Sequence, residues 1–172
     1  MAPASGSVLA LAARLRGMDD DALTRLVAAR GVREHGVRDF FDLAEALLDR
    51  TSVQAALERL DRGTLALLST AGRLAAASGA PTAAELAREL GIDDAEVARR
   101  AGIAIDACLL AEESGRYAPW DAVMEQLDAW PEFGLPAARE LTGTPPPPAL
   151  EPVTASDARF VDRGAGDRAF AT

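Results

Sequence analysis

Residues 81–120, PTAAELARELGIDDAEVARRAGIAIDACLLAEESGRYAPW, decide the fold. Thr82 is followed three residues later by Glu85, which is the spacing of a capping box at the start of a helix. Gly91 ends that helix after about two turns, because glycine is the usual residue just past a helix C-terminus. Asp93 repeats the capping pattern with a glutamate three residues on. The stretch therefore predicts two short helices joined by a tight turn.

A β-hairpin is predicted directly after the second helix. Two short extended segments, 109–113 and 116–118, flank the turn residues Ser114 and Gly115. A longer helix, expected over Thr64–Ser78, precedes the pair of short helices. This order of helix, short helix, turn, helix and hairpin is typical of a winged helix-turn-helix. A plain helical bundle is the alternative.

Three short amphipathic helices are predicted before residue 50. Ser7 is expected to cap the first, and the aspartates Asp19–Asp21 begin the second, which ends at Arg30 before a glycine. The third runs from about Arg38 to Asp49. Helices this short are not stable alone in water, so we expect them to pack together as an N-terminal helical unit over residues 7–50.

The second unit is expected over residues 51–130. Thr51 and Gln54 have the spacing of a capping box, and Asp61-Arg62-Gly63 interrupts the apolar stripe that follows. A last helix is predicted from about Ala122 to Trp130. The predicted fold is therefore mainly α, with a helical N-terminal unit packed on a winged helix-turn-helix-like unit that carries one small β-hairpin.

The character of the chain changes after Trp130. Residues 131–152 contain the run Pro145–Pro148, which predicts a stiff extended linker. Residues 153–172 form a charged tail in which aspartates alternate with arginines. The tail ends abruptly, so we expect the chain to be truncated.

Composition argues against an enzyme. The chain has 172 residues, and all 18 of its basic residues other than histidine are arginine, which excludes mechanisms that need a catalytic or phosphate-binding lysine. His35 and Cys108 are the only residues of their types, too few for a zinc site or an internal disulfide. Asp19–Asp21 suit a helix start better than a cation site. We expect no catalytic residue, no metal, no cofactor and no small-molecule substrate.

The chain is acidic, with a formal net charge of −9 at pH 7. A DNA-binding domain is usually basic on at least one face, so the charge weakens a direct role in DNA binding. The sequence has no run of 18 apolar residues, the length needed to span a membrane. Residues 1–7 lack the pattern of a signal peptide. We expect a cytoplasmic protein that does not contact membranes.

A winged helix that binds DNA would use its second short helix and its hairpin. The only cationic set there is Arg88, Arg99, Arg100 and Arg116, and Tyr117 accompanies it on the wing. These five residues are the candidate nucleic-acid contacts.

Acidic residues stand beside the candidate contacts. They occupy the first turn of the second helix and the wing, so ion pairs with glutamate, or a solvated face, are the alternative for the arginines. Trp120, Trp130 and Cys108 are expected in the core.

Four segments resemble one family: LRGMDDDALTRL (15–26), DRTSVQAALERLD (49–61), Pro81–Gly91 and Pro145–Pro148. They are similar to the N-terminal region of the actinobacterial helicase-associated proteins, whose later portion is similar to a domain of XPB-type DNA helicases. The resemblance extends from about Val8 to Phe170. It implies a non-catalytic DNA-associated or scaffolding module of a larger protein with a part in DNA transactions such as DNA repair, with no catalytic residue to carry over.

Two other functions stay open. A winged helix can serve protein–protein contact alone, with a partner or with the C-terminal remainder of the same chain, and an acidic second helix favours this. A free-standing transcriptional regulator would need a dimer and a basic helix. If DNA is bound, Arg99, Arg100 and Arg116 should share one face without carboxylates between them.

Overall fold

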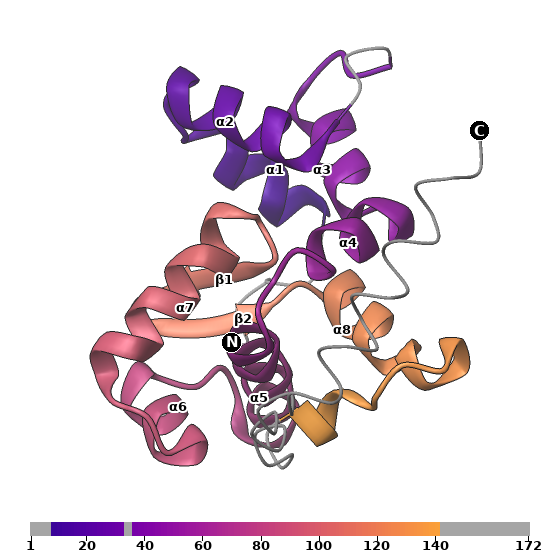
Figure 1. Cartoon of the computed structure of the whole chain (residues 1–172). Helices are drawn as coiled ribbons and strands as arrows, with labels where there is room; N and C mark the ends of the chain where they lie inside the picture. The colour runs from indigo at the N-terminus through magenta and orange to yellow at the C-terminus, as the bar shows by residue number, and fades with distance from the viewer. Residues whose placement is uncertain (1–7, 33–35, 142–172) are drawn as a thin grey trace, which may run out of the picture.

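A computed structural model describes residues 8–32 and 36–141, and in this part of the chain the protein is mainly helical with one small hairpin (Figure 1). Ser7, His35, the Pro145–Pro148 run and the charged tail lie outside the described residues. In chain order the elements are α1 Val8–Arg16, α2 Asp20–Arg30, α3 Phe40–Leu48, α4 Arg50–Leu57, α5 Arg62–Ser78, α6 Ala83–Leu90, α7 Asp94–Asp106, β1 Leu110–Glu113, β2 Arg116–Pro119, α8 Asp121–Asp128, and the 3-10 helices η1 Trp130–Phe133 and η2 Ala138–Leu141.

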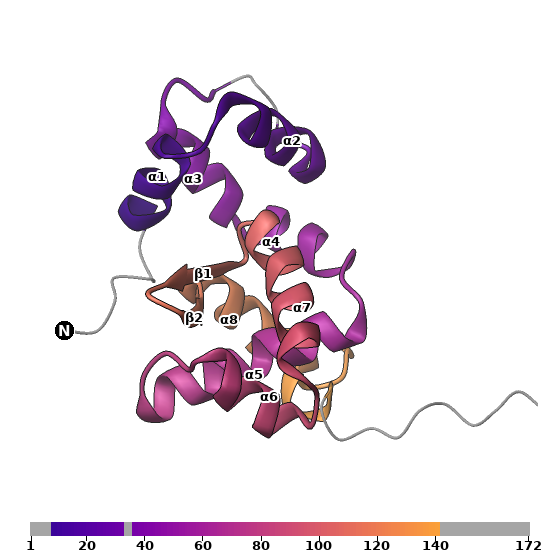
Figure 2. The same cartoon turned by 90° about the vertical axis from the view of Figure 1, so that its left-hand side faces the viewer.

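Helices α1, α2 and α3 gather at one end of the molecule, and α4 lies at their border with the rest (Figures 1 and 2). Asp39 caps α3 by accepting from the backbone amides of its first turn, so this helix starts two residues later than predicted. Asp49 is both the last cap of α3 and the first cap of α4.

The predicted capping box of Thr51 and Gln54 is wrong. Asp49 accepts instead from Thr51 N at 2.9 Å and from Ser52 N at 3.4 Å, which places Thr51 inside the helix. An aspartate at the true N-cap satisfies the free amides, so the later threonine has none left to bind. Gln54 is then free to make the long-range contacts described below.

Helix α5 is the centre of the fold. Every residue from Thr64 to Gly72 is buried, and the helix packs against α6, α7, α8, β2 and η2. Asp61 caps its start by accepting from Thr64 N at 2.7 Å, which confirms the predicted break in the stripe. A stretch of helix that is buried on all sides needs apolar or small residues around its whole circumference, as residues 64–72 have.

The two short helices and the hairpin form as predicted. The capping box of Thr82 and Glu85 is present, Gly91 has a left-handed φ of 66°, and Asp93 caps α7. Strands β1 and β2 are antiparallel, with Leu110 opposite Pro119. The backbone also places one isolated bridge between Thr82 and Arg116, so the segment before α6 runs beside the hairpin.

The predicted core residues after α7 are confirmed. Trp120, Trp130 and Cys108 are 2 %, 6 % and 1 % exposed. Trp130 also donates from its indole nitrogen to Gln54 Oε1 at 3.1 Å, which ties the end of α8 to α4. Both tryptophans therefore act as core anchors and have no free face for stacking on bases.

The described part of the segment predicted as a linker is not extended. Residues 130–133 and 138–141 form η1 and η2, and η2 packs on α5. Arg62 of α5 donates to the carbonyl oxygens of Leu141 and Glu140 at 3.1 and 3.2 Å. The chain is thus fastened to α5 as far as residue 141.

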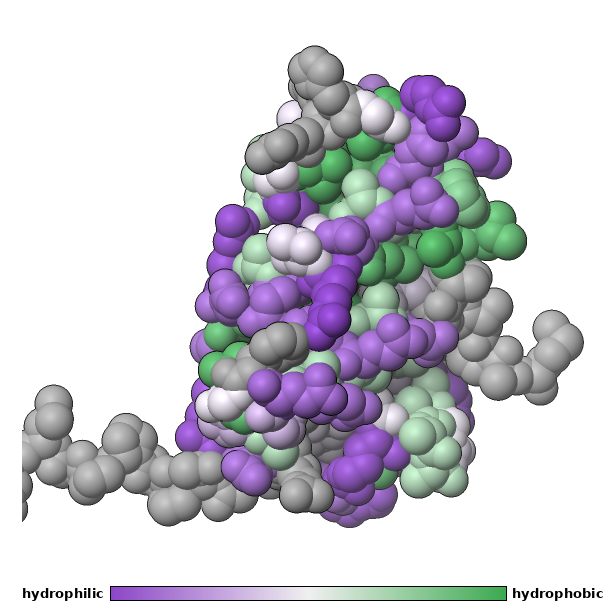
Figure 3. All heavy atoms as spheres, turned by 90° about the vertical axis from the view of Figure 1, so that its right-hand side faces the viewer, coloured by the Kyte–Doolittle hydropathy of each residue, from purple (hydrophilic) through white to green (hydrophobic). Residues whose placement is uncertain are grey.

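The surface carries both hydrophilic and apolar side chains. Figure 3 shows hydrophilic side chains interspersed with apolar ones over one face. The exposed large apolar side chains of the described residues include Leu9 at 70 % and Phe41 at 42 % exposure. Within residues 8–32 and 36–141, no helix has both the length and the apolar character needed to cross a membrane.

We expect Gly102→Ala to stabilise the protein by about 1 kcal/mol, because glycine costs roughly this much inside a helix. Gly102 lies within α7, and a Cβ added there meets no atom within 4 Å. Thermal unfolding followed by circular dichroism would measure the gain. Gly91→Ala is the matched comparison and should destabilise, since Gly91 has a positive φ and also meets open space. A destabilised Gly102→Ala variant would contradict this account.

Candidate nucleic-acid interface

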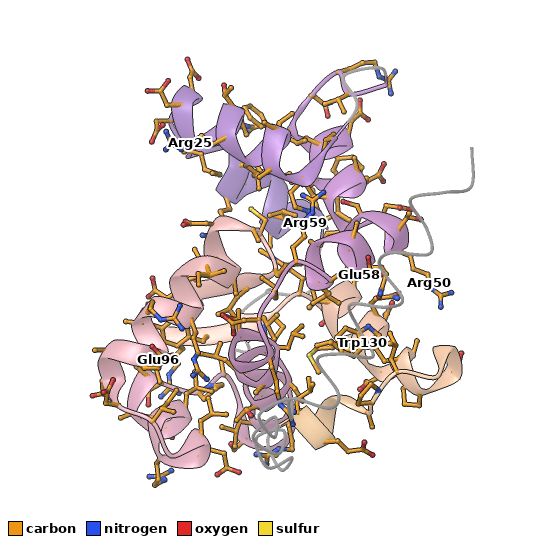
Figure 4. The ribbon with its side chains drawn as sticks, viewed as in Figure 1. Arg25, Arg50, Glu58, Arg59, Glu96 and Trp130 are labelled. Carbon is orange, nitrogen blue, oxygen red and sulfur yellow. The ribbon has the colours of Figure 1, made fainter. Side chains whose placement is uncertain are left out.

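Glu96 of α7 binds both of the arginines predicted to contact DNA from this helix. Its carboxylate accepts from Arg99 Nε and Nη2 at 2.7 and 2.8 Å, and from Arg100 Nε at 2.6 Å. The three side chains lie on one side of α7 because residues three and four apart share a helix face. Figure 4 shows Glu96 on this helix. A carboxylate therefore stands between the two arginines.

Arg100 is also held by packing. Its side chain is only 20 % exposed, and a Cβ added to Gly63 at the start of α5 would lie 2.5 Å from its Cζ atom. Glycine at position 63 makes room for the guanidinium. Arg99 and Arg100 both help to lower the pKa of Asp61, although the hydrogen bond from the Thr64 backbone amide is the larger cause. Arg100 thus joins α7 to the first turn of α5.

A second carboxylate faces the other two candidate arginines. The pKa of Glu85 is lowered mainly by the hydrogen bonds it accepts from the Thr82 amide and hydroxyl, and further by the charges of Arg116 and Arg88. Arg116 also donates from Nη1 to Ala80 O at 2.7 Å. Arg88 is exposed on α6. These two arginines therefore also share their surroundings with a carboxylate.

The structure thus divides the four candidate arginines into two groups. Arg99 and Arg100 meet at Glu96, while Arg88 and Arg116 lie around Glu85. Tyr117 is half-buried on β2, and its backbone amide donates to Pro81 O at 2.8 Å. The requirement for a face of arginines without carboxylates between them is not met.

Acidic and apolar side chains make up most of the remaining exposed surface of α7 and β1. Asp93 and Asp94 at the start of α7 are exposed, as are Glu112 and Glu113 at the end of β1. Between the charged residues, α7 exposes small and apolar side chains, which are Ala95, Ala98 and Ile103. Such side chains cannot donate hydrogen bonds to base edges.

No metal centre emerges. Among the described residues, no group of three or more histidine, cysteine, aspartate or glutamate side chains could hold a metal ion. Asp19, the first of the three consecutive aspartates, caps α2 by accepting from Ala22 N at 2.7 Å. The helix-start interpretation of this aspartate is confirmed.

The ion pairs of Glu96 with Arg99 and Arg100 should make the stability of the protein depend on pH, and we expect a titration of Glu96 to show this. Hydrogen bonds from Arg99 and Arg100 lower the pKa of its carboxyl from the ordinary 4.5 to about 2. Because the folded pKa is the lower one, the stability that these pairs add is complete above about pH 4.5 and is lost as the pH falls toward 2.

Nuclear magnetic resonance of the Glu96 side-chain carboxyl carbon would follow this titration. In an Arg99→Ala/Arg100→Ala variant the midpoint should return toward 4.5. A midpoint that stays near 4.5 in the unaltered protein would show that the pairs do not persist in solution.

Comparison of the chain with protein-family models, with curated proteins and with solved structures finds no match. The resemblance to helicase-associated proteins therefore stays a prediction.

Proposed function

We propose that this chain is a non-catalytic winged-helix module of a larger DNA-associated protein, and that it serves as a scaffold through contacts with protein. The partner is another protein or the C-terminal remainder of its own chain. The order α5, Thr82 bridge, α6, α7, β1 and β2 supports the winged-helix assignment. The observation that carries the proposal is the carboxylate of Glu96 bound between Arg99 and Arg100.

Charge is the first argument against α7 in a DNA groove. A phosphate that approached Arg99 or Arg100 would also meet the carboxylate of Glu96, which accepts from both guanidinium groups and offsets their charge. Asp93 and Asp94 would add to the repulsion at the end of the helix that approaches the bases. A free-standing DNA-binding regulator is disfavoured for the same reason.

The exposed side chains of α7 are the second argument. Ile103 is 38 % exposed, and Ala95 and Ala98 of the same helix are exposed as well. Surfaces that mix apolar contact area with a polar rim are typical of protein–protein interfaces. Burial of these apolar side chains against a protein partner leaves no donor or acceptor of their own unpaired.

Fluorescence anisotropy of labelled duplex and single-stranded DNA tests the proposal, at about 50 and about 200 mM salt, where phosphate-driven binding changes steeply. We expect no binding of the unaltered protein at micromolar concentrations. Glu96→Gln is the informative variant, since it removes the carboxylate and leaves both arginines. If the carboxylate is what prevents binding, this variant should gain salt-sensitive affinity.

Salt-sensitive binding by the unaltered protein would overturn the proposal if it were lost in Arg99→Ala/Arg100→Ala. Such a result would establish direct DNA contact through α7. Arg73→Ala is the matched control, because Arg73 lies on α5 and pairs with Glu89 rather than with Glu96.

A further inference from the structure

The side chain of Arg30, the last residue of α2, is buried in the protein interior. It is 8 % exposed, and burial lowers the pKa of its guanidinium. Nη1 donates to Ala107 O at 2.5 Å, while Nη2 donates to Leu47 O at 2.5 Å and to Ser52 Oγ at 2.9 Å. The three acceptors are two backbone carbonyl oxygens and a hydroxyl oxygen, all of them uncharged.

Both carbonyl groups lie at helix C-termini. Leu47 is in the last turn of α3, and Ala107 is the C-cap of α7. The C-terminal end of a helix carries partial negative charge on its free carbonyl groups, which favours a cation there. Two helix ends therefore supply part of the compensation that a carboxylate would otherwise give to a buried arginine, while the buried Nε atom of Arg30 has no hydrogen-bond partner among the described residues.

Arg30 also spans the joint between α3 and α4. Asp49 is the only residue between these helices, and Nη2 of Arg30 binds Leu47 on one side of it and Ser52 on the other. A second arginine reinforces the arrangement, since Arg59 after α4 donates to Ala29 O in the last turn of α2. Figure 4 shows Arg59 where α1–α3 meet the rest of the molecule.

We propose that α1, α2 and α3 form a lobe that swings about Asp49, and that Arg30 is the latch that holds this lobe closed over the turn between α7 and β1. With the latch closed, the angle between α3 and α4 is fixed, and both are tied to the end of α7. With the latch open, the lobe stays attached through Asp49, and the turn it covers becomes accessible to solvent.

Cys108 lies in the covered turn and makes the proposal measurable. It is the only cysteine of the chain and is 1 % exposed. Burial raises the pKa of its thiol, and the charges of Arg14 on α1 and Arg30 on α2 act in the opposite direction, so the lobe contributes to its surroundings. Both tryptophans, Trp120 and Trp130, lie outside the lobe. Thiol reactivity therefore reports on the latch, and tryptophan fluorescence reports on the rest.

The test is the rate at which Cys108 reacts with an aromatic disulfide reagent in the unaltered chain, in Arg30→Met and in Arg25→Met. Arg25 is an exposed arginine of the same helix and serves as the control. Hydrogen bonds to a charged group are individually worth about a tenfold change or more. We expect Arg30→Met to react at least about tenfold faster than Arg25→Met.

Urea separates opening of the lobe from global unfolding. Partial opening exposes less surface, so the thiol reaction of Arg30→Met should depend less steeply on urea than the unfolding followed by tryptophan fluorescence. Equal urea dependences would overturn the proposal, because only global unfolding would then expose Cys108. Equal rates in Arg30→Met and Arg25→Met would overturn it as well.

Ser52→Ala keeps the test decisive if Arg30→Met does not fold. This change removes one of the three bonds of Arg30 and leaves the charge in place. An increase in the reaction rate of about fivefold supports the latch. A rate equal to that of the unaltered protein would contradict it.

Discussion

Leu67→Ala is expected to lower the free energy of unfolding by about 4 kcal/mol, because truncating a fully buried leucine removes transfer free energy and leaves a cavity. Leu67 is 0 % exposed in the middle of α5, the helix that packs against five other elements. Neighbours on all sides hold the cavity open and limit its collapse. Urea unfolding followed by circular dichroism would measure the loss.

Leu9→Ala is the matched control for this prediction. The same chemical change is made on α1, where Leu9 is 70 % exposed, and the expected change in free energy is below about 0.5 kcal/mol. Similar losses in the two variants would show that α5 is not the centre of the core.

Gln54→Leu is expected to cost about 3 kcal/mol. The Oε1 atom of Gln54 accepts from Gln126 Nε2 at 2.8 Å and from Trp130 Nε1 at 3.1 Å. Leucine would leave these two buried donors without a partner, and each unsatisfied group costs about 1–3 kcal/mol. Unfolding in urea, monitored by tryptophan fluorescence, gives both the stability and a direct signal from the Trp130 surroundings.

The control for Gln54→Leu is Glu58→Gln. Glu58 accepts from the other end of the same side chain, from Gln54 Nε2 at 2.8 Å, but is itself exposed. Its replacement should change stability by no more than about 0.5 kcal/mol. An equally small loss of stability in Gln54→Leu would contradict the prediction. It would mean that water replaces Gln54 as the acceptor for Gln126 and Trp130, and that their hydrogen bonds to Gln54 do not stabilise the fold.

The sequence predicts those parts of this fold that depend on short-range chemistry. Caps such as Thr82 with Glu85, and the turn at Ser114-Gly115, need only residues a few positions apart, so spacing identifies them. The ion pairs of Glu96 belong to the same class, since the partners are three and four residues away on one helix. Acidic neighbours of the candidate arginines could therefore be weighed from the sequence alone.

Contacts between residues far apart in the sequence cannot be predicted from local spacing. Arg30 looks like an ordinary positive charge at a helix end, and only the fold shows that Ala107, 77 residues away, accepts from it. Gln54 fits a capping pattern locally, yet its partners are 72 and 76 residues distant. In both cases the competing partner lies on another element, and tertiary packing overrides the local motif. Arg100 against Gly63 is a third example.

The joint at Asp49 has a consequence for chain length. Asp49 is at once the C-cap of α3 and the N-cap of α4, so an inserted residue there would separate the two helices and leave one of them without this cap. Val53 and Leu57 of α4, both 0 % exposed, could then not keep their places in the core while α3 kept its own. The hairpin tip at Ser114-Gly115 is exposed, so an inserted epitope or peptide should be tolerated there and rejected at Asp49.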